Sequence, residues 1–437
     1  MGHTHGHSDA DVRVPPRIQR LLIAAVMPFM VATLVGLVFL WPAGDPKVEP
    51  GGFVADEVRG TVTAVERDEC PDIPGQEGFN CSRVTIRVEE GRDAGETFEL
   101  QYTSAPRVRN IQVGDGVIVG KAPPQQEAAA GAPAATPTPD YFFVDFDRRV
   151  PLLALSVLFS IVVVALSRWR GLAALAGVAI SLTILVRFVL PAILDGKEPL
   201  LVAIVGGAAI MFVALYLAHG LNAATTTAVL GTLISLVLTG LLGLLFVDLA
   251  IFTGAGSEEA FFLQINQQQV NLQGLLLASI IIGTLGVLDD VTVTQASAVW
   301  ELHRANPAYG VANLYRAGVR IGRDHIASTV NTLVLAYAGA SLPLLIIFSI
   351  SNRDLSQVLN SEIVAEEIVR TFVGSIGLVA AVPVTTGLAA FVVSAAARYS
   401  STGDTPDEEH SEAAEDVEPP EPTFRPSRRE REWREGN

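Results

Sequence analysis

The stretch LQGLLLASIIIGTLGVLDDVTVTQASAVWE, residues 272–301, decides the fold class. Its first part, residues 272–288, is long and apolar enough for a transmembrane helix, and it ends in Asp289 and Asp290. Carboxylates at the edge of hydrocarbon are unfavourable, so their presence needs a physical reason. Two interpretations remain open: the pair belongs to a functional site, or it marks the water interface and caps the helix that follows.

The helical period arranges the polar residues of this stretch. Asp290, Thr294, Ser297 and Glu301 recur at i, i+4, i+7 and i+11, which predicts one polar stripe on a helix. Asp289 and Asp290 would point about 100° apart on the same helix. We therefore do not expect the two aspartates to share a proton.

The composition indicates an α-helical polytopic membrane protein. Half of the residues are hydrophobic (50%) and only 17% are charged, so the long apolar runs suit a bilayer better than one large soluble core. Counting stretches of about 20 apolar residues predicts about eight transmembrane helices. They are residues 21–40, 150–167, 172–190, 200–218, 224–247, 272–288, 326–350 and 371–397.

The arginines predict the orientation, since basic residues are retained on the cytoplasmic side in short loops. Arginines lie before the first span and then in alternate loops, while the opposite loops are mainly acidic. This pattern predicts cytoplasmic N- and C-termini and places Asp289, Asp290 and Glu301 near the cytoplasmic face. The first span (21–41) is too long for a typical signal peptide and lacks an A-x-A site, so we expect an uncleaved anchor.

A small extracytoplasmic β-domain is predicted at residues 50–122. Short alternating segments such as VRGTVTAVER and RVTIRVEE, separated by glycine-bearing turns, favour a β-barrel-like domain of the OB type. Residues 141–146 are a candidate for an additional strand. The domain lacks a basic cleft with interleaved aromatic residues, so we expect no nucleic-acid binding.

Both cysteines, Cys70 and Cys81, fall in this domain. On the oxidising side of the membrane they are expected to form a disulfide that contributes about 3 kcal/mol by the chain-entropy model. A metal site is the weaker interpretation, because no C-x-x-C spacing or nearby histidine accompanies the pair.

Three segments have the composition of unfolded chain. Residues 123–140 are rich in proline and alanine and are expected to form a semi-extended tether. Residues 1–20 and 398–437 are expected to be disordered cytoplasmic ends. The alternating His3, His5 and His7 are weak candidates for metal ligands, because no fixed geometry or fourth ligand accompanies them.

A second polar cluster lies in GRDHIASTVNTLVLAYAGASLPLL, residues 322–345. Asp324 is expected to cap the helix that begins at residue 326, with Arg323 on the cytoplasmic side. Asn331 and Thr332 would then lie one to two turns inside the membrane. They are candidates for a second wall of the site, and helix–helix hydrogen bonding is the open alternative.

These two segments resemble the signature motifs of the YibE/F family of bacterial multi-pass membrane proteins. GTLGVLDDVTVTQASAVWEL matches a G-x-x-G-x-x-x-D run that leads to a glutamate, and GRDHIASTVNTLVLAYAGASLPLL matches the second motif in the expected order. The resemblance covers about residues 150–397 and implies a permease-like protein of the bacterial plasma membrane. It marks the following residues: Asp290, Glu301, Arg323, Asp324, Asn331, Thr332, Tyr337 and Pro343. Many relatives have methionine at the position of Leu288 or Asp289, so the resemblance does not mark Asp289.

The leading functional hypothesis is a proton-coupled secondary transporter or exporter of an unidentified small solute or ion. Asp290 or Glu301 would carry the proton, and Asn331 and Thr332 would line the path. We expect no cofactor and no ATP-driven step, because no P-loop is present. One alternative is a non-transporting scaffold whose β-domain binds a partner. A membrane hydrolase that uses aspartates is the other, and the divergence of Asp289 and Asp290 argues against an enzyme.

Overall fold

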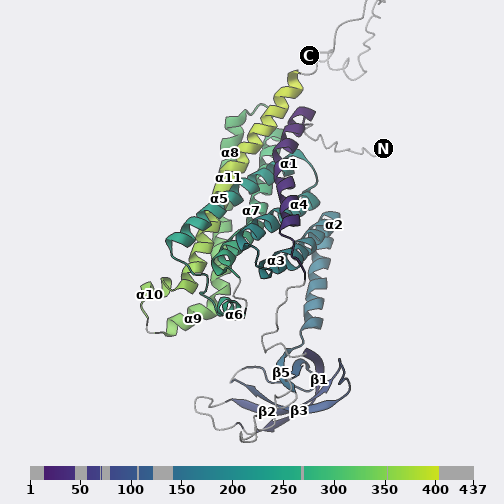
Figure 1. The fold of residues 1–437 in the computed structure, drawn as a ribbon. Helices are drawn as coiled ribbons and strands as arrows, with labels where there is room; N and C mark the ends of the chain where they lie inside the picture. Colours follow the sequence, from purple (N-terminus) through teal and green to yellow (C-terminus); the bar gives the residue numbers. More distant parts are fainter. Residues whose placement is uncertain are drawn as a thin grey trace, which may run out of the picture.

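The computed structural model describes residues 14–44, 57–68, 70, 79–105, 108–121, 141–266, 270–351 and 353–402. The chain forms a bundle of helices and a separate β-domain, which lies at one end of the bundle (Figure 1). Both chain termini leave the bundle at the other end. The predicted metal ligands His3, His5 and His7 lie outside the described residues.

The first helix, α1 (Pro16–Phe39), begins five residues before the predicted span at residue 21, with a proline in its first turn. Proline suits this position because its missing N–H would have no partner within the helix. α1 packs on α4 (Pro199–His219) and α5 (Ala223–Leu249). Gly36 allows this approach, since a Cβ there would lie 2.6 Å from a Val205 side-chain carbon.

The β-domain is one antiparallel sheet in the order β3-β2-β1-β4-β5. The strands are β1 (Glu57–Asp68), β2 (Asn80–Val88), β3 (Thr97–Ser104), β4 (Gly116–Lys121) and β5 (Tyr141–Phe146). The sheet curls until its two outer strands meet: the Phe98 ring on β3 stacks on Tyr141 on β5, with centroids 4.4 Å apart. Val62, Val84 and Val117 are fully buried inside it.

Strand β5 changes the predicted domain boundary. It pairs with β4 from Val117↔Phe146 to Lys121↔Tyr141, so the domain extends to Phe146 instead of ending at residue 122. Residues 123–140, whose structure lies outside the described residues, therefore connect two strands of one sheet. They do not tether the domain to the membrane helices, because only two residues separate β5 from the next helix at Arg149.

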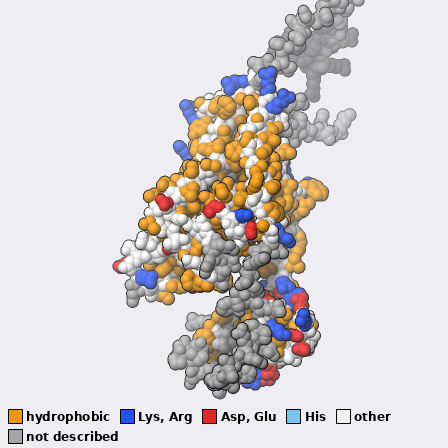
Figure 2. Space-filling model, in the orientation of Figure 1, with side chains coloured by type: hydrophobic (Ala, Val, Ile, Leu, Met, Phe, Trp, Pro, Cys, Tyr) orange, Lys and Arg blue, Asp and Glu red, His pale blue; other side chains and the backbone are white. Residues whose placement is uncertain are grey.

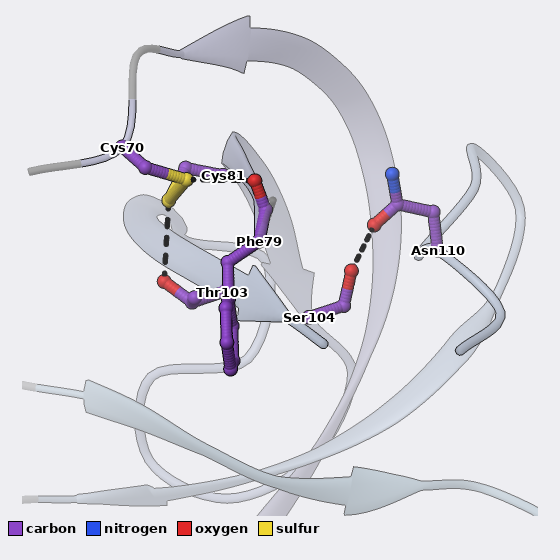
Figure 3. Close-up of a disulfide and its surroundings, with 6 residues drawn as sticks. All are labelled: Cys70, Phe79, Cys81, Thr103, Ser104 and Asn110. Carbon is purple, nitrogen blue, oxygen red and sulfur yellow. Dashed lines mark hydrogen bonds between the residues drawn. A yellow bond between two sulfur atoms is a disulfide. The ribbon is translucent and has the colours of Figure 1, made fainter. Parts of the chain in front are cut away.

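A disulfide joins Cys70 to Cys81, as the sequence predicts (Figure 3). Cys81 lies at the start of β2. The hydroxyl oxygen of Thr103, on the neighbouring strand β3, is 3.6 Å from the Cys81 sulfur. The Ser104 hydroxyl lies 2.7 Å from Asn110 Oδ1 and holds the following loop. The crosslink thus fixes the end of β1 to the β2–β3 pair.

Two predicted spans, residues 150–167 and 172–190, fall within one continuous helical segment. α2 (Arg149–Ile184) continues through a π-helical turn, η1 (Leu185–Val189), into α3 (Leu190–Leu194). Inside α2 the backbone breaks at Arg168, which has φ 51° and ψ −128°. The half of α2 before this break is exposed along almost its whole length. The half after the break packs against α4, where Gly177 faces Ala214.

The centre of the bundle consists of α5, α7 (Leu272–Ala305) and α11 (Glu362–Thr402). At two places a threonine side chain packs directly on a glycine of the neighbouring helix, and neither glycine has room for a Cβ atom. A Cβ at Gly231 would lie 2.2 Å from Thr385 Oγ1, and one at Gly377 would lie 2.0 Å from Thr239 Oγ1. The close approach of α5 and α11 therefore depends on these glycines.

The remaining helices complete the bundle. They are α6 (Glu258–Asn266), α8 (Val311–Ala340), α9 (Leu342–Ile350) and α10 (Leu355–Leu359). The predicted span 326–350 is broken: α8 and α9 bend by 63° at Ser341, and Pro343 lies in the first turn of α9. Pro383 lies inside α11. α11 starts at Glu362, well before the predicted span at residue 371.

Within the described residues, six helices are long and apolar enough to cross a membrane, or up to seven when α8 and α9 count as one span. This count is below the predicted eight because α2, η1 and α3 form one 46-residue segment. Lys and Arg side chains gather at the end of the bundle from which both termini leave (Figure 2).

Candidate functional site

The two aspartates of α7 have different surroundings. Asp290 is exposed, whereas Asp289 is partly buried and its Oδ1 atom is buried without a hydrogen-bond partner. The helical rotation of about 100° between neighbours accounts for this difference. A buried polar atom without a partner is unfavourable, so Oδ1 has the capacity to accept one further hydrogen bond or a cation. This unsatisfied buried atom distinguishes Asp289 from the exposed Asp290.

Hydroxyl groups of α5 and α7 adjoin Asp289. The Thr232 side chain lies beside its carboxylate, and the Thr232 and Thr292 hydroxyl oxygens are 2.7 Å apart. Thr292 also donates a 3.1 Å hydrogen bond to the backbone oxygen of Asp289. Both threonines are fully buried. They fix one side of the carboxyl group and leave Oδ1 available.

Asp289 lines a cavity of about 520 Å³ between the second half of α2, α4 and α7. Its polar lining comes from five residues: Ser181, His219, Asp289, Asp290 and Thr294. The other walls are apolar, for example Val178, Leu215 and Val293. His219 ends α4, so the polar groups gather toward one end of a mainly apolar cavity.

The predicted polar stripe divides between the cavity and the surface. Asp290 and Thr294 line the cavity, while Ser297 and Glu301 are exposed outside it. Glu301 forms an exposed ion pair with Arg304 at 2.7 Å, one turn along the same helix. This pairing leaves Glu301 without the isolation that proton coupling requires.

The predicted second wall does not reach this cavity, because α8 contributes no residue to its lining. Arg323, Asp324, Asn331 and Thr332 are all exposed on α8. The Thr332 hydroxyl donates to the Ser328 backbone oxygen at 3.0 Å, within its own helix. The structure therefore does not bring Asn331 and Thr332 together with the two aspartates.

Tyr337 alone among the predicted α8 residues lies against α7. A Cβ added at Gly283 would be 3.4 Å from the Tyr337 hydroxyl oxygen. This contact is more than one helical turn from Asp289, so Tyr337 supports the packing of α7 and α8 and does not reach the carboxyl group.

Gln295 is a buried polar residue of α7 that the stripe did not include. Its side-chain amide donates to the Gly318 backbone oxygen and to Thr386 Oγ1, both at 2.7 Å. The hydrogen bonds tie α7 to α8 and α11. Asp289, Thr292 and Gln295 recur at i, i+3 and i+6, which places them on one face of α7, although this spacing alone does not show that the face is buried.

A further polar cluster lies at the end of the bundle nearer the β-domain. Glu362 Oε1 accepts hydrogen bonds from Thr253 N, Thr253 Oγ1 and Gly254 N at 2.7–2.9 Å. Arg370 pairs with Glu367 at 2.6 Å, while its Nε atom and Glu366 Oε1 are buried without partners. The charge pattern of the sequence predicts acidic outer loops, whereas Glu362, Glu366 and Glu367 lie in the first turns of α11.

The helical part of the chain matches a known protein family. The model of the YibE/F-like protein family matches residues 155–395, which run from the first half of α2 to the last turns of α11. The chain belongs to the YibE/F-like family. The match excludes α1 and the whole β-domain, and it includes Asp289, Asp290 and the whole cavity. No curated protein and no solved structure matches the chain. The YibE/F resemblance seen in the two motifs is thus confirmed.

Proposed function

We propose that this YibE/F-like membrane protein is a proton-coupled secondary transporter and that Asp289 carries the proton. The observation that supports the proposal is the Oδ1 atom of Asp289, buried without a partner at the wall of a 520 Å³ cavity. This assignment replaces the expected Asp290 and Glu301. Asp290 is exposed at the cavity, and Glu301 is paired with Arg304 outside it.

The coupling follows from the cost of an uncompensated charge. In an apolar cavity the carboxyl group is stable with a bound proton or with a bound cation, and unstable with neither. Exchange of one for the other links solute movement to proton movement. Thr232 and Thr292 hold the carboxyl group in place during the exchange.

We propose the topology that this function requires. The termini and the arginine-rich end lie in the cytoplasm of a bacterium, and the β-domain lies on the outer side of the plasma membrane. Two spans then meet at the Arg168 break, and with α8 and α9 as one bent span the predicted eight crossings are restored. The strand order of the curled sheet favours the OB type for the β-domain.

Flux measurements in proteoliposomes test the proposal. Proton-coupled solute flux in wild-type protein should fall to the level of protein-free liposomes in Asp289→Asn. Glu301→Gln is the matched control, because it also removes a carboxylate from α7, but outside the cavity, and it should retain wild-type flux. Equal flux in wild type and Asp289→Asn would overturn the assignment.

A second candidate is a scaffold whose β-domain binds a protein partner. The observation that favours it is the edge strand β5, on which Phe142 and Val144 are exposed. If the full-length protein retained its cellular role with Asp289→Asn and lost it with charged substitutions at Phe142 and Val144, the scaffold would be preferred. A hydrolase has no comparable support, since the adjacent aspartates diverge.

A further inference from the structure

We propose that the cavity between α2, α4 and α7 binds a lipophilic organic cation, with Asp289 as its counter-ion. The inference rests on the proposed transport function and names the class of solute. It is drawn from the charge, the size and the apolar walls of the cavity.

The charge of the lining selects a cation. α7 supplies two carboxyl groups, Asp289 and Asp290, and no Lys or Arg lines the cavity. α2 supplies no charged group and α4 supplies only His219. An anion would meet uncompensated carboxylates, whereas a cation would compensate the group that has no partner.

The size and walls of the cavity select an organic molecule. Its volume of about 520 Å³ lies within the range of small-molecule pockets, roughly 300–1,000 Å³. Most of its lining is aliphatic, and a bound apolar group would be removed from water there. Lipophilic substituents therefore match the walls while the positive centre lies at the polar end.

An inorganic ion does not match this lining. Calcium takes 6–8 oxygen ligands, and zinc needs about four convergent nitrogen, sulfur or oxygen ligands. No group of three or more His, Cys, Asp or Glu side chains suitable for a metal occurs in the described part of the chain. The cavity thus has charge for a cation but too few ligands for a metal.

A second cavity provides the contrast. The space of about 330 Å³ between α1, α4 and α5 is lined by apolar side chains apart from Thr33. It is able to hold a hydrocarbon group but has no charged group for selection. The cavity at Asp289 combines apolar walls with a carboxyl group, which this second cavity lacks.

Binding exchanges a proton for the cation. The protonated carboxyl group of Asp289 releases its proton to solvent, and the resulting carboxylate forms an ion pair with the incoming cation. One positive charge leaves as one enters, so the buried site stays neutral. The affinity for the cation should consequently increase with pH, and one proton should appear in solution for each cation bound.

The experiment uses purified full-length protein in nanodiscs and tetraphenylphosphonium as the probe. Calorimetry in buffers of different ionisation enthalpy measures affinity and proton release together. We expect saturable binding with proton release in wild type and in Glu301→Gln, and no proton-linked binding in Asp289→Asn. Asp289→Glu should restore the exchange, which separates a charge requirement from misfolding.

Three comparisons sharpen the test. Tetraphenylborate has nearly the same shape and the opposite charge, so it should not bind at this site. Val178→Phe adds bulk to the cavity wall without changing its charge and should weaken tetraphenylphosphonium binding at least tenfold. His219→Gln should keep the pH dependence, because His219 is exposed and Asp289 is the exchanging group.

The outcomes separate this inference from the proposed function. Equal binding of tetraphenylborate, or binding without proton release, would overturn the cation proposal. Proton-coupled flux of another solute with no tetraphenylphosphonium binding would refute the solute class and leave the transporter intact. Proton-linked binding that never produces flux in proteoliposomes would support the site and refute transport.

Discussion

The β-domain and the helical bundle differ in how completely their polar side chains are hydrogen-bonded. Among the described residues, nine buried side-chain nitrogen or oxygen atoms lack a hydrogen-bond partner, and all lie between Ser235 and Ser394 in the bundle. In the β-domain the prominent charged groups are paired: Lys121 contacts Asp93 at 2.6 Å, and Arg109 contacts Asp115 at 2.7 Å. Buried polar groups are normally satisfied, so unsatisfied ones need an explanation.

This contrast distinguishes a structural part from a working part. Stacked aromatic rings join the outer strands of the sheet, a disulfide crosslinks it, and none of the nine unsatisfied buried atoms of the described residues lies in it. In the bundle, Asp289 Oδ1, Ser235 Oγ and Thr385 Oγ1 keep unmet bonding capacity beside close helix contacts. We therefore place stability in the first region and transport in the second.

The largest effect on stability is expected from the disulfide. Cys81→Ser removes a crosslink between residues 11 apart, and the chain-entropy model gives a loss of about 3 kcal/mol for such a loop. The full-length protein should then show protease cleavage within the β-domain at a lower urea concentration. Proteoliposome flux at ambient temperature should be unchanged, and a large loss of flux would break the separation between the two regions.

The next effect tests the central packing of the bundle. Gly231→Ala places a methyl group about where Thr385 Oγ1 now lies, so α5 and α11 must separate at a cost of about 1–3 kcal/mol. Thermal unfolding in nanodiscs measures the change. Thr385→Ala in the same chain removes the clashing hydroxyl and should recover part of the stability, whereas no recovery would mean that the Gly231–Thr385 contact is not the cause.

The ion-pair cluster of the β-domain predicts a pH dependence. Hydrogen bonds from Lys121 and then Tyr141 lower the pKa of Asp93 below its usual 3.8. A lowered pKa in the folded state stabilises the domain above the unfolded value of about 3.9, and this contribution disappears as the pH falls through the folded pKa. The urea midpoint of the domain should decrease over that acid range.

The same cluster acts in the opposite direction at alkaline pH. The hydrogen bond that Lys121 donates to the Asp93 carboxylate raises the pKa of Lys121 above 10.5. This contribution to stability is complete below the unfolded pKa and is lost as the pH rises through the folded pKa. Asp93→Asn should remove both dependences. Glu99→Gln, on the exposed side of β3, should leave both in place, and identical pH profiles for Asp93→Asn and wild type would contradict the pairing.

The smallest effect is expected at Glu301. Its partner Arg304 is one turn away, and the Glu301 side chain is 67% exposed, so the ion pair contributes only about 0–1 kcal/mol. Glu301→Gln should change the thermal midpoint in nanodiscs by no more than a degree or so at this level of stability. A large shift would mean that this part of α7 has a partner besides Arg304.

Sequence periodicity predicted the helices well, but it did not predict which face of α7 is buried. The predicted spans are helical in the structure, although 326–350 is divided between α8 and α9, and the β-domain contains the predicted additional strand at residues 141–146. The stripe from Asp290 to Glu301 is regular, yet regularity alone cannot say whether a face meets solvent or protein. That depends on α4 and α5, which come from distant parts of the sequence. The buried stripe of Asp289, Thr292 and Gln295 therefore appears only when these helices are in place.

The break at Arg168 falls between the predicted spans 150–167 and 172–190, so the sequence indicated its place but not the positive φ of the backbone there. The surroundings of polar residues were less predictable. Asn331 was expected to be inside the bundle because its amide is polar, whereas the structure leaves it exposed on α8. Composition identifies polar residues that need partners but does not say where the partners lie.

Infrared difference spectroscopy on the full-length protein in nanodiscs tests the central claim, that Asp289 holds an exchangeable proton. Addition of tetraphenylphosphonium to wild type should remove the C=O stretching band of one protonated carboxyl group and add carboxylate bands. The same change should be present in Glu301→Gln and absent in Asp289→Asn. If the band persisted unchanged in Asp289→Asn, the proton would reside on another group and the account of this site would be wrong.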